Sequence, residues 1–154
     1  MKVELVMPVR KEKRIARAGV YLIPNSFAQL AAVTPEHVDL KITDENLEEV
    51  DFNSDSELVG LSVLTLNANR ALEISRKFKE KGKTVVWGGM HPSVVDQKDN
   101  KFIDSFVVGE AESVWPRLIE DFEKEKLKKR YQSEYPIDLN SIPLPRKEIG
   151  RAHV

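Results

Sequence analysis

Cysteine is absent from this chain of 154 residues, and histidine occurs only three times. The missing thiols exclude a disulfide, a thiolate zinc site and an iron–sulfur cluster held by this chain alone. Long apolar runs are missing as well, since none approaches the ~20 residues that a membrane-spanning helix needs. The N-terminus shows no signal-peptide pattern and leads directly into a strand-like run, so we expect a cytoplasmic protein with no membrane partner.

An excess of charge of either sign is also lacking. The formal net charge is −1 at pH 7, with 32% charged and 41% hydrophobic residues. This composition is typical of a soluble globular domain and gives no electrostatic reason to expect nucleic acid as a partner. The length suits one domain that buries a continuous core without metal or disulfide support.

Strand-like runs alternate with helical segments along the chain. Several of these runs are almost continuously apolar, which is typical of strands covered on both faces in a parallel sheet. The predicted strands are Val3 to Met7, Val38 to Thr43, Leu58 to Val63, Thr84 to Trp87 and Ser105 to Val108. The predicted helices are Ser26 to Val33, Asn69 to Lys81 and Ser113 to Lys124. The alternation predicts an α/β fold: a flavodoxin-like (Rossmann-like), doubly wound, five-stranded parallel sheet of order 2-1-3-4-5 with helices on both faces.

The helical and strand patterns weaken from Leu127 onward. A lysine-rich stretch over 124–130 predicts a solvated surface, and prolines punctuate the tail that follows. We therefore expect an α/β domain over residues 1–131 and a linker over residues 132–154.

Ligands of an open α/β sheet bind beside the carboxyl ends of its strands. The first strand is followed by Pro8-Val9-Arg10-Lys11, which contains no dinucleotide fingerprint, P-loop or hydroxyl-rich phosphate loop. A phosphoryl-accepting receiver domain is disfavoured too, because it requires clustered carboxylates for magnesium. After the third strand, Ser62 and Thr65 offer hydroxyls to a ligand, whereas Asn67 or Asn69 is explained by capping of the next helix.

The strongest ligand-edge signals are two glycine-containing loops. Gly88 and Gly89 form either an ordinary tight turn or a place of close approach to a ligand. His91 follows them, but two further histidines and no cysteine make a complete metal site hard to assemble. Glu110 and Glu112 flank the start of the last helix, where capping and dipole complementarity explain carboxylates. Trp115 is most simply a core residue.

Three phrases together resemble the N-terminal cobalamin-binding domain of cobalamin-dependent radical SAM enzymes. They are Ser62-Val63-Leu64, Gly88-Gly89-Met90-His91-Pro92 and Val107-Val108-Gly109-Glu110-Ala111-Glu112. The resemblance extends to Ala28 to Pro35, to Asp44-Glu45-Asn46 and to the exit Ile142-Pro143-Leu144-Pro145-Arg146. It covers most of the chain, in a consistent order and spacing.

The resemblance implies cobalamin as the cofactor and the following cofactor-binding residues: Ser62, Val63, Leu64, Thr65, Gly88, Gly89, Met90, His91, Pro92, Gly109 and Glu110. The Asp-x-His-x-x-Gly motif, whose histidine ligates cobalt in many other cobalamin proteins, is absent after the first strand, as the resemblance to the radical SAM branch implies. Cobalamin would thus be held without a protein histidine, facing Pro8, Arg10 or the segment Tyr21 to Asn25. No catalytic residue and no metal ligand is expected in this chain.

In full-length relatives the Pro-Leu-Pro-Arg exit leads into a radical SAM barrel, which holds a [4Fe-4S] cluster and S-adenosylmethionine. This chain therefore resembles an excised N-terminal domain whose partner is that barrel, with methyl transfer or related radical chemistry as the expected activity of the whole enzyme. Two alternatives stay open. One is a degenerate flavodoxin-like scaffold that docks the barrel and binds no cofactor, and the other is an FMN-binding flavodoxin-like protein.

Overall fold

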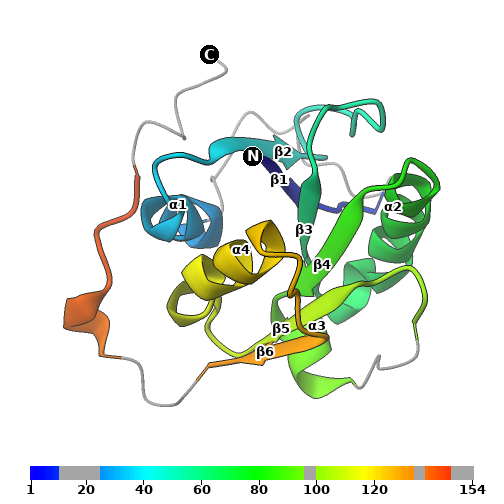
Figure 1. Cartoon of the computed structure of the whole chain (residues 1–154). Helices are drawn as coiled ribbons and strands as arrows, with labels where there is room; N and C mark the ends of the chain where they lie inside the picture. The colour runs from blue at the N-terminus through cyan, green and yellow to red at the C-terminus, as the bar shows by residue number, and fades with distance from the viewer. Residues whose placement is uncertain (11–24, 96–99, 134–137, 147–154) are drawn as a thin grey trace.

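The computed structural model describes residues 1–10, 25–95, 100–133 and 138–146 (Figure 1). The strands are β1 (Lys2–Met7), β2 (Asp39–Asp44), β3 (Leu58–Ser62), β4 (Thr84–Gly88), β5 (Ser105–Val108) and β6 (Arg130–Gln132). The α-helices are α1 (Asn25–Val33), α2 (Ala68–Glu80), α3 (Met90–Val94) and α4 (Trp115–Glu123). Short 3-10 helices are η3 (Thr65–Asn67), η4 (Ala111–Ser113) and η5 (Leu139–Ser141).

All six strands of the described chain form one parallel sheet of order β2-β1-β3-β4-β5-β6. The predicted doubly wound α/β fold and the order 2-1-3-4-5 are confirmed. The predicted number of strands is wrong, because β6 extends the sheet by pairing in parallel with β5. Position 131, where we expected the domain to end, lies inside this strand, and the buried side chain of Tyr131 belongs to the core.

The helices cover the two faces of the sheet (Figure 1). On one face, Phe27 of α1 joins Trp115, Leu118 and Ile119 of α4 in one apolar cluster. On the other face, α2 contributes Ala71, Ile74 and Phe78 to a second cluster. The successive side chains of a strand point to opposite faces, so each central strand supplies both clusters. We call these the α1/α4 face and the α2 face.

The five-residue helix α3 was expected to be loop. It begins directly after Gly89 and contains Pro92 in its first turn, where the missing amide hydrogen costs nothing. The amide of His91 donates to the carbonyl of Val63 at 2.9 Å, which attaches the helix to the end of β3. None of the helices in the described part of the chain is long and apolar enough to cross a membrane.

The segment 138–146 lies against α1. The side-chain amide of Gln29 donates to the carbonyl of Pro143 at 2.6 Å, and the amide of Arg146 donates to the carbonyl of Ala28 at 3.1 Å. Leu144 is 85% exposed, whereas Ile142 and Pro145 are half-buried, so the two hydrogen bonds are joined by only partial apolar burial. The part of the expected linker that the structure describes is thus attached to the domain.

Candidate functional site

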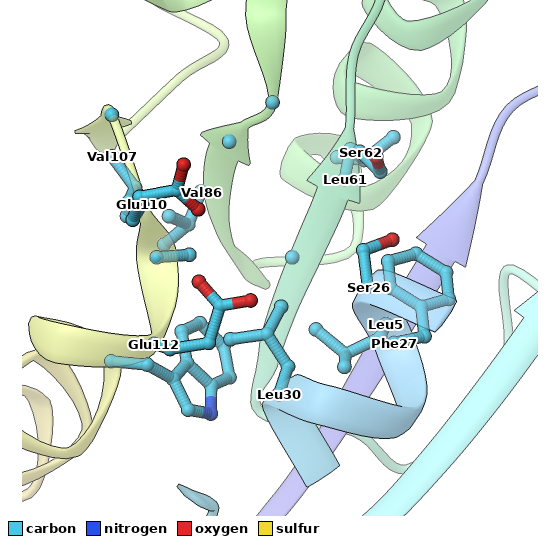
Figure 2. A pocket seen from close by; sticks show the side chains of 16 residues that line it. Leu5, Ser26, Phe27, Leu30, Leu61, Ser62, Val86, Val107, Glu110 and Glu112 are labelled. Atoms are coloured by element: carbon cyan, nitrogen blue, oxygen red, sulfur yellow. The ribbon is translucent and has the colours of Figure 1, made fainter. Parts of the chain in front are cut away.

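A cavity of about 170 Å³ opens at the carboxyl ends of the central strands and runs down the α1/α4 face (Figure 2). Its floor is formed by Leu5, Gly60, Ser62, Val86, Gly88 and Val107 of the sheet. Its walls are formed by Ser26, Phe27 and Leu30 of α1 and by Trp115 of α4. Gly89, Gly109 and Glu110 surround the mouth, and Glu112 projects further in, between Val86 and Leu30 (Figure 2). The loops that sequence reasoning selected therefore meet at one opening.

The cavity exists because small residues occupy the middle of the sheet on this face. A Cβ atom added to Gly60 would lie 2.9 Å from Cδ2 of Leu5 and 3.5 Å from Cη2 of Trp115. A Cβ on Gly88 would meet only Cβ of Val107, at 3.7 Å. Gly60 thus lets Leu5 and Trp115 pack closely over the sheet, whereas Gly88 leaves space that a larger side chain would fill. The result is a narrow slot with mostly apolar walls.

Gly89 has a different role from its neighbour Gly88. Its φ of 97° lies in the region that favours glycine, and an added Cβ would lie 2.9 Å from the carbonyl oxygen of Val63. The absence of a side chain therefore lets the β4–α3 loop pack against the backbone at the end of β3. Gly89 shapes the mouth, whereas Gly88 leaves space in the floor.

Side chains of α3 cross-link the loops around the mouth. The hydroxyl of Ser93 donates to the carbonyl of Gly89 at 3.0 Å and accepts from the amide of Gly109 at 3.1 Å. Nδ1 of His91 lies 3.2 Å from the hydroxyl of Thr65, which connects α3 to η3. The two glycine loops are thus held at a fixed separation, although neither His91 nor Thr65 lines the cavity.

Ser133, the residue directly after β6, forms hydrogen bonds with the end of β5 and with the loop at the mouth. The amide of Ser133 donates to the carbonyl of Val108 at 3.1 Å, and the hydroxyl of Ser133 accepts from the amide of Glu110 at 2.9 Å. Ser133 is buried. This residue falls in the segment expected to be linker, so sequence reasoning missed its contribution to the site.

The deep end of the cavity is closed by a hydrogen bond between its two helical walls. The indole N–H of Trp115 donates to the hydroxyl of Thr34 at 2.9 Å, and this hydroxyl donates to the carbonyl of Leu30 at 2.8 Å. Trp115 is 2% exposed, so the bond satisfies a buried donor. Trp115 is a core residue, as expected, and it also forms part of the cavity wall.

A second hollow, of about 430 Å³, lies next to the cavity at the carboxyl ends of β1 and β3. Both spaces are lined by Ser26 and Ser62. The remaining lining of the second hollow includes Met7, Pro8, Val9, Arg10, Leu64 and Leu66. Pro8 and Arg10, two of the expected corrin neighbours, therefore border the same region as Ser62. Of the third, Tyr21 to Asn25, only Asn25 lies within the described residues.

A buried ion pair fixes the edge of this second hollow. The guanidinium of Arg70 donates to the Glu45 carboxylate, with the shortest contact at 2.6 Å, and the amide of Val9 donates to the same carboxylate at 3.0 Å. The Glu45 side chain is 1% exposed and that of Arg70 is 13% exposed. Hydrogen bonding to Glu45 raises the pKa of Arg70 above its ordinary value. The pair joins β2, the β1 loop and α2.

The eleven predicted cofactor-binding residues are brought to the same edge of the sheet but not into one lining. The cavity is lined by Ser62, Gly88, Gly89, Gly109 and Glu110, and the second hollow by Ser62 and Leu64. The others do not line either space: Val63 and Pro92 are buried, His91 is 7% exposed, and Thr65 and Met90 are exposed on the outer surface.

Two capping explanations require correction. Asn67 makes no side-chain capping bond to α2. Its side chain caps the preceding turn η3 instead, by accepting from the amide of the N-cap residue Leu64 at 2.8 Å, and it donates to the carbonyl of Pro8 at 2.9 Å. Neither η4 nor α4 has a side-chain capping bond, so Glu110 and Glu112 do not cap these helices. Both carboxylates line the cavity instead.

Sequence reasoning missed the helical walls and Gly60 of the floor. The signal for Gly60 was present, because Gly60 and Ser62 are two residues apart in β3 and so share one face. No group of three or more potential metal ligands occurs in the described part of the chain. His37 pairs with Glu123 at 2.7 Å on the surface, and His153 lies outside the described residues.

The chain matches no protein-family model. It is 34% identical over 125 residues to a bacteriochlorophyllide d C-8(2)-methyltransferase of Chlorobaculum tepidum, covering 80% of this chain and 28% of that protein. It is 30% identical over 132 residues to the bacteriochlorophyllide d C-12(1)-methyltransferase of the same organism, covering 84% of this chain and 29% of that protein. The chain is therefore homologous to part of these enzymes and spans less than a third of their length.

Among solved structures, the N-terminal domain of a hypothetical protein from Thermotoga maritima aligns with a TM-score of 0.48 at 19% identity. The alignment covers 74% of this chain and 100% of that domain. A similarity of this level transfers no property to the chain.

Proposed function

We propose that this chain is a cobalamin-binding module of a radical SAM methyltransferase and that the cavity between α1 and α4 receives part of the cofactor. The observation that carries the proposal is the glycine-lined slot at Gly60 and Gly88, which opens at the loops containing Ser62 and Gly109. The relatives named methyltransferases support the activity of the whole enzyme, because they share this segment of sequence.

The cavity fits a flat heteroaromatic base better than any other part of cobalamin. It is narrow, mostly apolar and about 170 Å³ in volume, so it suits the base of the nucleotide tail and excludes the corrin ring. The corrin would lie outside the mouth, where Pro8 and Arg10 line the second hollow. Ser62, Gly88, Gly89 and Gly109 would then hold the tail as it enters.

The residues of this chain would bind and orient the cofactor, which supplies methyl-transfer chemistry when bound. A protein histidine on cobalt is not part of the proposal. His91 packs against Trp87 on the α2 face, with ring centroids 6.1 Å apart, and does not line the cavity. The [4Fe-4S] cluster and S-adenosylmethionine would belong to a radical SAM barrel, which is the proposed partner.

The FMN alternative gains no support from the cavity. A bound flavin nucleotide needs donors or cations for its phosphate. Among the described lining residues of the cavity there is no lysine or arginine, and two carboxylates, Glu110 and Glu112, are present. The terminal phosphate of FMN carries about two negative charges and would find no cation in this lining, whereas the phosphodiester of the cobalamin tail carries one and would lie outside the mouth. The scaffold alternative predicts that the cavity binds no cofactor, which the following experiment decides.

Titration of the purified chain with hydroxocobalamin tests the proposal. We expect corrin absorbance to co-migrate with the protein in gel filtration and to saturate at one equivalent. The Gly88→Val variant should weaken this binding at least tenfold, because its side chain would occupy the floor of the slot. The Val94→Leu variant is the matched control, since Val94 is 70% exposed on α3 outside the cavity. Absence of binding at high micromolar cobalamin would favour the scaffold alternative.

A further inference from the structure

Glu112 is an acidic residue within an otherwise apolar part of the cavity. It comes from η4, and its carboxylate projects towards the space between Val86 and Leu30 (Figure 2). Glu110 is exposed, whereas Glu112 is partly buried. Two carboxylates of the same loop therefore occupy different environments.

The protein itself does not use the Glu112 carboxylate. It makes no capping bond to η4 or α4, and within the described residues it has no hydrogen-bond or ion-pair partner. The described lining also contains no lysine or arginine that would neutralise it. A half-buried carboxylate that lines a mostly apolar cavity and makes no bond to the described protein is available to a ligand.

Filling the cavity would make this carboxylate costly unless the ligand brings a donor. In the open cavity, the half-buried carboxylate remains accessible to water. A ligand that displaces this water must replace its hydrogen bonds, because a desolvated charge without a partner is strongly unfavourable. An O–H or N–H group of the ligand is acceptable at this point, and an anionic group is not.

We propose that Glu112 is a specificity-determining residue that accepts a hydrogen bond from a sugar hydroxyl of the ligand's nucleotide. This inference rests on the proposed function, because it assigns a contact to the nucleotide tail of cobalamin. The chemistry has a precedent in doubly wound folds, where an acidic side chain accepts from ribose hydroxyls. The adjoining walls, Leu30 and Trp115, would contact the base, and Glu112 would contact the sugar attached to it.

The test compares cobalamin with cobinamide, which has the same corrin but lacks the nucleotide. Dissociation constants are measured by absorbance titration for the wild-type chain and for Glu112→Ala and Glu112→Gln. We expect Glu112→Ala to weaken cobalamin binding about tenfold, as for the loss of a hydrogen bond to a charged group. Glu112→Gln keeps a neutral acceptor and should weaken it about threefold. Neither variant should change the affinity for cobinamide.

Glu120→Gln is the matched control. It removes the same charge from the exposed side of α4, where Glu120 pairs with Lys124 outside the cavity, and should leave both affinities unchanged. Thermal unfolding of each variant checks that it is folded. If the alanine variant is unstable, the nearly isosteric Glu112→Gln variant still tests the inference.

The outcomes separate the two proposals. If the wild-type chain does not bind cobalamin, both the proposed function and this inference are wrong. A wild-type chain that binds cobalamin, with Glu112 variants that bind it equally well, overturns the inference alone. Equal weakening for cobalamin and cobinamide also overturns it, because the effect would then not depend on the nucleotide.

Discussion

The two faces of the sheet are built from the same strands but are packed in different ways. On the α2 face, β3 and β4 present Leu61 and Trp87, which are both 2% exposed and belong to a closed core. On the α1/α4 face, the same strands present Gly60, Ser62 and Gly88, and a cavity takes the place of side chains. One face stabilises the fold, and the other retains space.

This difference shows where the energetic cost of a cavity is compensated. A cavity forgoes the dispersion contacts and apolar burial that packed side chains would provide. The α2 face offsets this with large interlocked groups, including Phe78 against Phe52 with ring centroids 5.2 Å apart. The indole of Trp87 also donates to the hydroxyl of Ser75 at 2.8 Å, so its buried N–H is satisfied.

Truncating one phenylalanine on each face gives the largest expected contrast. Phe78→Ala on the closed face should lower the free energy of unfolding by about 4 kcal/mol, because it loses burial and creates a new void. Phe27→Ala should cost only about 2 kcal/mol, because Phe27 already borders a cavity and mainly its transfer free energy is lost. Urea unfolding of both variants measures the difference. Equal costs would show that the α1/α4 face is as tightly packed as the α2 face.

The next contrast concerns backbone conformation at the mouth. Gly89→Ala combines a left-handed φ of 97° with a 2.9 Å contact to the Val63 carbonyl, so we expect a loss of about 3 kcal/mol. Gly82→Ala is the control: its φ is 74°, but nothing lies within 4 Å of the added Cβ, so roughly 1 kcal/mol is expected. Chemical denaturation gives both values. If the two costs are the same, the close approach to β3 contributes nothing.

Much of this arrangement follows from the sequence. Continuous apolar runs such as Val85 to Trp87 predict buried parallel strands, and glycines at strand ends predict the ligand edge. The small residues Gly60 and Ser62 also indicate which face of the sheet is open, because residues two apart in a strand point to the same face. That pattern becomes informative only when the neighbouring strand is known to have Gly88 in register with Ser62.

The remaining features depend on tertiary contacts. Strand β6 is three residues long, with a single buried side chain, Tyr131, so it has no periodicity of its own. Helix α3 is too short for a helical pattern and depends on the backbone bond from His91 to Val63. The direction in which the Glu112 side chain points depends on how η4 packs against the sheet. The local sequence does not distinguish Glu112 from an ordinary carboxylate at the start of a helix.

Tyr131 tests how β6 completes the α1/α4 face. Its hydroxyl donates to Asp121 at 2.8 Å and accepts from the amide of Lys128 at 3.0 Å, and burial above all raises its pKa from 10.0. The folded state thus favours the protonated phenol, so its contribution to stability is complete below about pH 10 and is lost as the pH rises through the higher folded pKa. Tyr131→Phe should cost about 1 kcal/mol at pH 7 and remove this alkaline loss. Urea unfolding at pH 7 and at alkaline pH checks both, and an unchanged alkaline loss in the variant would assign it to other groups.

The smallest expected effect on stability belongs to Gly88, and it is the most specific test of the contrast between the faces. An alanine methyl there meets only Val107, at the ordinary contact distance of 3.7 Å, and no left-handed φ opposes it. We expect a change of less than about 0.5 kcal/mol in the free energy of unfolding, as for substitutions outside packed positions. The methyl nevertheless narrows the floor of the cavity, so hydroxocobalamin should bind several-fold more weakly, as absorbance titration would measure. A large loss of stability would mean that the space beside Gly88 belongs to the packed core, whereas unchanged stability with weaker binding would show that the open face is kept for a ligand.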